Sequence, residues 1–480
     1  MLFNSISFLV FFPIVFILYW FVANYDLKWQ NLLLLAASYY FYACWDYRFL
    51  FLLIFSTCLD YFTGLKMEES MTPQKRRRWF WLSVVINLGF LGVFKYYNFF
   101  ITSFAEGLSQ IGIHINMWMI NVILPVGISF YTFHGLSYVI DIYNKKIKAE
   151  RNFIDYSLFV SFFPLLVAGP IERATHLLPQ IKHQRIFVSK EAIRGIELII
   201  WGFFKKLVIA DTMAIIVNKV YLDPASYGGG ALLISAFAFS FQIYGDFSGY
   251  SDIAIGTSKL FGIDLIQNFN FPYLSRNIAE FWRKWHISLS SWFRDYLFIP
   301  LGGSRVSQLL SIRNVFIIFL VSGIWHGANW TFVVWGGIHA VLFVPSFIIG
   351  SNKKFQQEDI ILKGKPIPKL SDMLHMLLTF VVVTMAWIFF RAVSLRQAFN
   401  ILKRIFSNAK GNDLLFQTND LLTYGIIFSV FFLLSLYFLY VKKQIFSQGN
   451  TSRFLVCVLL LMVITLFGQF FEQSFIYFQF

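Results

Sequence analysis

The sequence predicts an all-α, polytopic membrane protein. Of its 480 residues, 58% are hydrophobic and 20% aromatic but only 14% are charged, and its mean hydropathy of +0.63 lies far above that of a soluble enzyme. Windows of roughly 20 apolar residues, enough to cross about 30 Å of hydrocarbon, recur along the whole chain. Basic residues collect between these windows, as the positive-inside rule expects of cytoplasmic loops.

The apolar windows predict about 11 transmembrane helices. Two shorter runs, 153–168 and 312–325, are interrupted by Gly or Pro, so we expect re-entrant or interfacial segments that are buried in protein or face a cavity. The first window resembles a signal peptide but lacks a basic start and a small-residue cleavage site, so we expect a retained helix. The predicted spans are 6–24, 30–46, 49–65, 79–99, 117–140, 192–211, 229–246, 328–350, 372–391, 422–441 and 454–471.

Loop lengths and loop charges predict the domain organisation and the topology. Because the longest weakly apolar stretches hold only about 20 residues, no soluble domain is expected. The basic clusters at 75–78 and 145–151 are separated by two predicted spans, which places both on the cytoplasmic side and both chain termini outside. We expect a single membrane domain over 1–480, with N-terminal helices in 1–150, a core in 151–350, C-terminal helices in 351–471 and a tail in 472–480.

Composition and motifs disfavour several functional classes. The formal net charge of +15 could attract nucleic acid, but membrane topology is a sufficient reason for basic loops. Cys44, Cys58 and Cys457 lie in or beside predicted spans without metal-ligand spacing, so neither a disulfide framework nor a metal site is supported. The sequence has no P-loop, G-x-S-x-G or H-E-x-x-H motif, which disfavours ATPases, serine hydrolases and metalloproteases. It shows no internal repeat, which disfavours a transporter.

The segment Ala279–Tyr296 is dense in Trp, Arg and His within an otherwise lipid-soluble chain. Its apolar residues fall on one helical stripe and its polar residues mostly opposite, which predicts one amphipathic helix at the membrane interface that ends before Pro300. A structural helix that skims the membrane would show the same stripe. The polar candidates for substrate contact, for which ion pairs or headgroup contacts are the alternative, are Arg283, Lys284, Arg294 and Asp295.

His326 lies in SGIWHGANW directly after an apolar run, which places an ionisable group at or near membrane depth. Such groups are costly there and usually functional. The flanking Gly323 and Gly327 would let another backbone or a long ligand approach closely. A neutral imidazole suits proton abstraction near neutral pH, so His326 is a candidate base. The alternative is a helix-packing histidine bonded to a carbonyl.

Three other histidines lie in apolar surroundings. His286 is on the edge of the amphipathic stripe beside a tryptophan, where it could be functional or simply hydrogen-bonded within the structure. His134 and His339 lie in predicted spans with no partner at catalytic spacing, so we interpret both as packing residues.

Two polar segments interrupt apolar regions. QIYGDFSGYSDIAIG contains Asp246 and Asp252, which are six residues apart and do not share a helical face well, so we expect them to order a broken helix around a cavity rather than to act as a glycosidase-like pair. AGPIER, residues 168–173, predicts a break at a re-entrant turn with an ion pair at its exit.

Together these segments resemble the membrane-bound O-acyltransferase family, in its polysaccharide-modifying branch. The resemblance rests on FWRKWHISLSSWFRDYLFIPLGG, followed 40 residues after its histidine by the histidine of WHG. It extends through MLFNSISFLVFF, PVGISFYTFHGLSY, AGPIER and QIYGDFSGYSDIAIG, and so covers nearly the whole chain. Within the branch, the sequence looks most like the membrane subunit of bacterial alginate O-acetylation and second most like the D-alanyl transfer protein of teichoic acid modification.

The resemblance implies the family's fold, a ring of helices around a thin funnel-shaped core, in an enzyme of the bacterial cytoplasmic membrane. It implies transfer of an acyl group, expected to be acetyl from acetyl-CoA, across the membrane to an exported or cell-surface polysaccharide, without a bound cofactor. By resemblance His326 matches the essential histidine and would be the base, and His286 matches the second motif position and would orient the donor or polarise its carbonyl. Trp325 and Asp246 are further substrate-binding candidates.

The chain ends FIYFQF, which contains an F-x-Y-x-x-F pattern. This pattern resembles the tail of the small partner peptide in teichoic acid D-alanylation and the tails of polysaccharide O-acetylating members. Tyr477 is therefore a candidate acyl acceptor that would pass the group to an extracytoplasmic transferase. The alternative is a tyrosine of the interfacial aromatic belt.

Three other functions stay open. D-alanyl transfer from a carrier protein would need a docking surface for an acidic partner, which the basic loops permit. A lipid or protein acyltransferase of the same fold is disfavoured by the two terminal segments. The alternative of another class is a transporter or channel without acyl chemistry.

Overall fold

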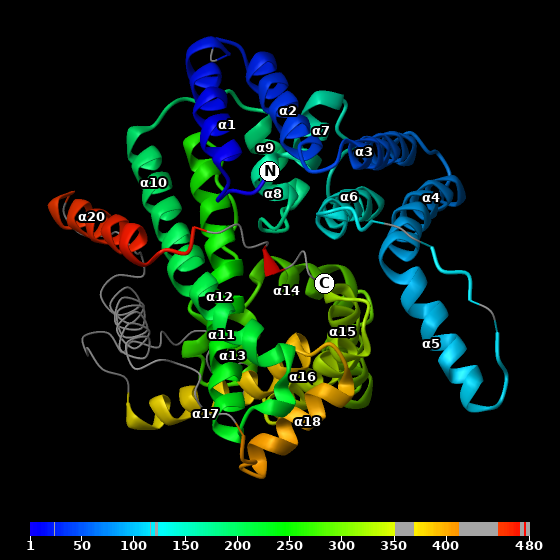
Figure 1. The fold of residues 1–480 in the computed structure, drawn as a ribbon. Coiled ribbons are helices and arrows are strands. Elements are labelled where there is room, and N and C mark those ends of the chain that lie inside the picture. The colour runs from blue at the N-terminus through cyan, green and yellow to red at the C-terminus, as the bar shows by residue number, and fades with distance from the viewer. Residues whose placement is uncertain are drawn as a thin grey trace. The chain divides into compact units, whose positions relative to one another are not determined.

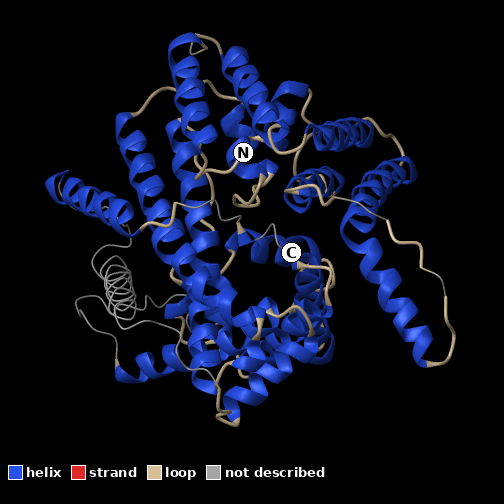
Figure 2. Cartoon of the chain, viewed as in Figure 1, coloured by secondary structure: helices blue, strands red, loops and turns tan. Residues whose placement is uncertain are grey.

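The computed structural model describes residues 1–23, 25–115, 117–120, 123–350, 369–411, 450–470 and 475–476. Figure 2 shows that these residues form helices and loops and no strand, so the all-α prediction is confirmed. Six apolar helices in this part of the chain are long enough to cross a membrane, while the predicted span 422–441 lies outside it. The six are α3 (Tyr47–Glu68), the run Pro73–Gln110, α12 (Gly229–Leu260), α15 (Gln308–His326), α16 (Trp330–Ile348) and α17 (Leu370–Arg391).

The chain divides into two compact units. Unit 1 comprises Met1–Gly195 and Ala254–Ile266, and unit 2 comprises Ile196–Ile253 and Gln267–Phe480. Two long helices, α10 (Ser189–Phe203) and α12, pass from one unit into the other.

Unit 1 begins with the apolar helix α1, continued by the π-helical segment η1 (Figure 1). Within the predicted span 117–140, helix α6 begins at Ile128, directly after Gly127, which has a left-handed φ of 75°. Besides α3, the helices of this unit are α1 (Ile6–Ile17), η1 (Leu18–Val22), α2 (Leu27–Ala43), α4 (Pro73–Leu91), η2 (Gly92–Tyr96), α5 (Tyr97–Gln110), α6 (Ile128–Tyr143), α7 (Phe153–Ser161), α8 (Phe163–Leu166) and α9 (Ala174–Ile181).

Helices α3, α4 and α6 pack together (Figure 1), and a buried carboxylate lies between them. Asp60 of α3 is 1% exposed and accepts hydrogen bonds from Ser83 Oγ and, at 2.7 Å, from Asn87 Nδ2 of α4. A Cβ on Gly135 of α6 would meet the Asp60 carboxylate at 2.0 Å, so only glycine allows this approach. The buried polar group is thus satisfied by its neighbours, as apolar surroundings require.

The two basic clusters that predict the topology lie at one end of these helices. Arg76 donates a hydrogen bond to the carbonyl of Ile142 at the end of α6. Arg151 lies 3.9 Å from Glu68 at the end of α3. Clusters 75–78 and 145–151 are therefore neighbours, as their assignment to one side of the membrane requires.

The predicted break near 153–173 is confirmed. Helices α7 and α8 are separated at Phe162, which precedes Pro164 by two residues. Beyond α8, the backbone N–H of Glu172 donates to Nε2 of His134 at 3.1 Å, so His134 is a packing residue, as predicted. The Glu172 carboxylate pairs with His176 at 2.8 Å and raises the pKa of that imidazole.

Unit 2 contains the long pair α15 and α16, with α17 packed against α16. The prediction of a partial span at 312–325 is wrong, because α15 is a full helix of 19 residues; Gly323 does not interrupt it but lets α16 approach. The other helices of this unit are the π-helical η3 (Phe204–Ala210), α11 (Asp211–Leu222), η4 (Pro224–Ser226), η5 (Pro272–Leu274), α13 (Ile278–Lys284), α14 (Ile287–Phe293), the π-helical η6 (Arg294–Phe298), α18 (Leu395–Phe406) and α20 (Asn450–Phe467).

The close approach of α15 and α16 predicts that replacing one of two adjacent glycines by alanine destabilises the protein, whereas replacing the other does not. A Cβ on Gly336 would lie 2.2 Å from the carbonyl oxygen of Phe319, whereas a Cβ on Gly337 would meet only Leu320 Cδ2, at 3.9 Å. We expect Gly336→Ala to destabilise the protein by about 1–3 kcal/mol through overpacking, and Gly337→Ala to be tolerated. Thermal unfolding of both variants in the same detergent measures the difference, and equal melting temperatures would contradict the packing argument.

Candidate functional site

The segment predicted as one amphipathic helix is broken at the histidine. The prediction of a continuous helix over Ala279–Tyr296 is wrong, because α13 ends at Lys284 and α14 begins at Ile287. His286 between them has φ 43° and ψ 56°, the left-handed region, which costs a non-glycine residue free energy and is frequent at functional sites. The apolar stripe continues across the break, which is why periodicity did not reveal it.

A short neighbouring segment supplies the hydrogen bonds that the break would otherwise lose. The backbone N–H of Ile287 donates to the carbonyl of Asn268 at 2.9 Å. The backbone N–H of Asn270 donates to the carbonyl of Lys284 at 3.0 Å. Because irregular backbone in a membrane protein must be satisfied within the protein, Asn268–Asn270 fixes where the chain leaves the helix.

The side chain of Asn268 also determines which nitrogen of His286 carries a proton. Asn268 is fully buried, and its Oδ1 lies 3.0 Å from Nδ1 of His286 and accepts from Ser288 Oγ at 2.9 Å. Its Nδ2 donates to Ser251 Oγ, so Oδ1 can only accept and Nδ1 of His286 must donate. In the neutral imidazole Nε2 then carries a lone pair, and it has no hydrogen-bond partner among the described residues.

His326 is the last residue of α15 and is 3% exposed. Its ring contacts Trp335 of α16 at a centroid distance of 5.1 Å and Phe390 of α17 at 5.2 Å. The glycine before it and the glycine after it were predicted to admit a backbone or a ligand. In the structure both glycines lie against Phe332 of α16, so the space they leave is filled by that helix.

The two histidines both contact one tryptophan. Trp325 is 5% exposed, and its ring lies 5.8 Å from that of His286 and 4.8 Å from that of His326. The structure therefore brings together three residues that the sequence singled out. The other rings of this cluster could not be predicted, because in a chain with 20% aromatic residues single ones do not stand out. The aromatic rings that contact the two histidines are Phe247, Phe269, Trp335 and Phe390.

His339 and Lys284 have partners of their own. Nδ1 of His339 receives a hydrogen bond from the indole of Trp282 at 3.3 Å, as expected of a packing residue. Lys284 pairs with Glu280 at 2.9 Å, and the same carboxylate pairs with Arg276 at 3.1 Å. Burial alone would raise the pKa of Glu280, but these two cations hold it below its ordinary value. Glu280 thus stays ionised, and sequence periodicity had placed it on the polar face without indicating that it is buried.

The other polar candidates lie along the same segment. Arg294 pairs with Asp295 at 2.7 Å, which is the ion pair that the sequence offered as the alternative to substrate contact. Arg283 is half-buried in the last turn of α13. Contact of these residues with a substrate stays a prediction.

Asp246 and Asp252 lie on an unbroken helix. The expectation of a broken helix around them is wrong, because α12 runs without interruption from Gly229 to Leu260. Asp252 pairs with Lys205 at 2.7 Å and Asp246 pairs with Lys206 at 2.8 Å, both lysines belonging to η3. The two carboxylates therefore balance two buried cations.

The C-terminal tail approaches this cluster. Phe475 and Ile476 are each 2% exposed. The ring of Phe475 lies 6.0 Å from that of Phe247, which contacts His286 at 4.6 Å. The predicted acyl acceptor, Tyr477, lies outside the described residues.

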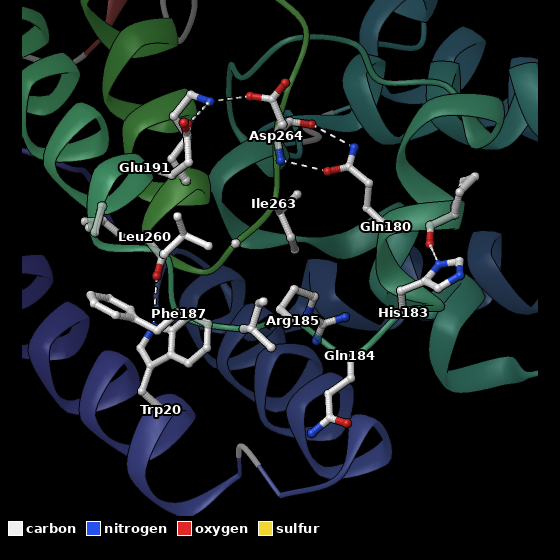
Figure 3. Close-up of a pocket in the computed structure, with 16 residues that line it drawn as sticks. Trp20, Gln180, His183, Gln184, Arg185, Phe187, Glu191, Leu260, Ile263 and Asp264 are labelled. Carbon is white, nitrogen blue, oxygen red and sulfur yellow. Dashed lines mark hydrogen bonds and ion pairs between the residues drawn. The ribbon is translucent and has the colours of Figure 1, made fainter.

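A cavity of about 490 Å³ lies within unit 1, shown in Figure 3. Its polar lining is occupied by internal contacts: Lys259 pairs with Glu191 and Asp264, and Arg185 donates to Tyr19 and to other partners. None of the sequence-predicted site residues lines it. All of those that the structure describes belong to unit 2.

Comparison with known proteins supplies the classification. Residues 144–354 match the membrane-bound O-acyltransferase family. A protein named "Probable alginate O-acetylase AlgI" from Pseudomonas aeruginosa is 40% identical over 408 residues, which cover 85% of this chain and 75% of the relative. The chain belongs to the membrane-bound O-acyltransferase family.

Two further members of the family show its range. The peptidoglycan O-acetyltransferase of Helicobacter pylori is 36% identical over 84% of this chain and 79% of its own length. The teichoic acid D-alanyltransferase of Bacillus subtilis is 31% identical over 49% of this chain and 62% of its own. Like the other members of this membrane-bound O-acyltransferase family, the chain is an O-acyltransferase and a membrane protein, rather than a transporter or channel.

The geometry around His286 makes Asn268 a testable supporting residue of this O-acyltransferase. Asn268→Leu should leave Nδ1 of His286 and Ser288 without their buried acceptor, which costs about 1–3 kcal/mol of stability, and should lower acyl transfer because the imidazole loses its fixed tautomer. Transfer rate and melting temperature measure the two effects. Ser291→Ala is the control, since the described partner of the Ser291 hydroxyl is the carbonyl of Ser288 and not His286; equal transfer by both variants would contradict the role of Asn268.

Proposed function

We propose that the protein moves an acyl group, acetyl from acetyl-CoA, across the bacterial cytoplasmic membrane for attachment to an exported or cell-surface polysaccharide. The observation that carries the proposal is that two buried histidines both contact Trp325, and that Phe475 of the C-terminal tail contacts Phe247, the ring beside His286. The names of two relatives, an alginate O-acetylase and a peptidoglycan O-acetyltransferase, support the acetyl group and the polysaccharide acceptor.

His326 is the proposed general base. It takes the proton of an incoming hydroxyl while the hydroxyl oxygen attacks the thioester carbonyl, and the departing thiolate recovers that proton as the thiol. The surrounding rings of Trp325, Trp335 and Phe390 exclude water, which favours transfer to the hydroxyl over hydrolysis.

His286 has a different proposed role. A neutral imidazole protonated at Nδ1 has no hydrogen to offer at Nε2, so it cannot polarise a carbonyl. It can accept a hydrogen bond, and His286 therefore orients an N–H of the donor rather than the thioester oxygen, since the single proton of the attacking hydroxyl goes to His326. The strained backbone and the Asn268 contact hold it for this purpose.

Tyr477 is the proposed carrier of the acyl group. Support comes from the two residues before it: both are buried, and Phe475 contacts Phe247, the ring beside His286. An extracytoplasmic transferase would then take the acyl group from the tyrosine and attach it to the sugar. The chain would thus separate a cytoplasmic donor from an external acceptor.

D-alanyl transfer from a carrier protein is the second candidate. The observation in its favour is the similarity to teichoic acid D-alanyltransferases, which extends over about half of this chain. The neighbouring basic clusters 75–78 and 145–151 would suit an acidic carrier protein. Turnover with a D-alanyl carrier but not with acetyl-CoA would select this function.

Removing the base should abolish transfer with little effect on folding. We expect His326→Ala to lower the rate by about 100-fold or more, which is the usual contribution of a general base. Purified protein incubated with radiolabelled acetyl-CoA measures thioester turnover. His134→Ala controls for the loss of a buried histidine, and full turnover by the His326 variant would exclude it as the base.

Replacing the acceptor hydroxyl separates turnover from transfer. Tyr477→Phe keeps the aromatic ring and removes the nucleophile, so we expect no label retained on the protein and no polysaccharide acylation. Label and acylation are measured together with wild type and a Tyr25→Phe control. Full polysaccharide acylation by Tyr477→Phe would reject the acyl-tyrosine.

A further inference from the structure

The part of unit 2 that the mechanism does not use contains an unusual number of buried charges. Lys206 Nζ lies 2.7 Å from Asp211 and 2.8 Å from Asp246, and the exposed fractions of the three side chains are 10%, 3% and 4%. Charges at such depth are expensive and are kept when they serve a purpose.

Asp246 uses its two oxygens for different partners. Oδ1 pairs with Lys206, whereas Oδ2 accepts a hydrogen bond of 2.6 Å from the backbone N–H of Ile476. A charged acceptor makes such a bond stronger than a neutral one would. The carboxylate of Asp246 thus joins Lys206 to the C-terminal tail.

The same stretch of α12 also holds the preceding tail residue. The ring of Phe475 contacts Phe247 at 6.0 Å and Tyr250 at 5.0 Å, which follow Asp246 by one and four residues. Backbone and side-chain contacts to two consecutive tail residues therefore come from one helical turn. Because a backbone hydrogen bond and aromatic contacts both hold the tail here, this turn of α12 is a specific binding site for it.

The glycines of GDFSG explain how the lysines reach this turn. A Cβ on Gly245 would lie 2.9 Å from the carbonyl oxygen of Lys205, and one on Gly249 would lie 2.8 Å from that of Gly202. Their absence lets the backbone around η3 approach α12 closely. As a result, Lys205 and Lys206 both reach carboxylates of α12.

We propose that Asp246 is a positioning residue that anchors the C-terminal tail through the backbone N–H of Ile476, with Lys206 and Asp211 holding its carboxylate. The effect of this anchor on acyl transfer rests on the function proposed for Tyr477, the next residue of the chain. The anchor itself does not, because it involves only the two residues before the tyrosine. Asp246 thus acts through the tail, and both of its oxygens are already engaged by protein.

Digestion of the full-length protein by a carboxypeptidase tests the anchor without any donor. In the wild type we expect trimming to stop before the buried Ile476. In Asp246→Asn, which leaves Lys206 paired with Asp211, we expect trimming through Ile476 and Phe475 to be about tenfold faster, since a charge-assisted bond becomes a neutral one. Intact-mass spectrometry follows the products.

Two further variants make the test specific. Asp252→Asn removes another lysine-paired carboxylate of α12, one that bonds neither of the two described tail residues, and should leave the tail protected. Ile476→Pro removes the N–H donor, and combining it with Asp246→Asn should add little, because both delete one interaction. Equal protection of the tail in wild type and Asp246→Asn, or additive effects of the two substitutions, would overturn the proposal.

Transfer assays then separate the anchor from the acyl carrier. With labelled acetyl-CoA, Asp246→Asn should lower kcat for transfer while leaving KM for the donor unchanged, because a positioning defect does not alter donor binding. A freed tail combined with full polysaccharide acylation by Tyr477→Phe would support the anchor and reject the acyl-tyrosine. A rise in donor KM without tail exposure would instead make Asp246 a donor-binding residue and overturn the anchor.

Discussion

The site depends on one constraint: backbone that leaves a helix inside apolar surroundings must find its hydrogen bonds within the protein. At the break between α13 and α14 the segment 268–270 provides them, and the side chain of Asn268 continues the same network to His286. The break, the left-handed backbone and the tautomer of the imidazole are therefore consequences of a single local arrangement. A regular helix through this segment would have given His286 none of these properties.

The same constraint separates structural histidines from candidate catalytic ones. His134 and His339 each have a ring nitrogen engaged by an N–H of the protein, from Glu172 and Trp282 respectively. The first contact satisfies a backbone N–H beside the AGPIER break, and the second joins helices α13 and α16. His286 differs because its protein partner is an acceptor, which leaves a basic nitrogen available. Burial alone does not distinguish these residues, since all three are fully buried.

The sequence allowed the membrane class, the family resemblance and the break at AGPIER to be predicted, and His286 and His326 to be chosen as candidate site residues, because each depends on composition or on local motifs. It did not reveal the break at His286, since apolar periodicity is insensitive to a single left-handed residue. Nor could it reveal Asn268, Phe247 or Lys206, whose importance comes only from contacts with residues distant in the chain. The helical continuity of α15 was missed because glycine suggests an interruption in isolation but close packing in context.

The π-helical segment η3 makes the pairing of the buried lysines depend on the number of residues in this part of the chain. A π turn contains one residue more than the α turn it replaces, and such bulges are frequent at functional sites. Deleting one residue from Phe204–Ala210 would rotate everything on one side of it by about 100° about the helix axis. Lys205 and Lys206 could then no longer both meet the carboxylates of α12. In this region the length of the chain, more than the identity of any apolar side chain, determines whether its charges remain balanced.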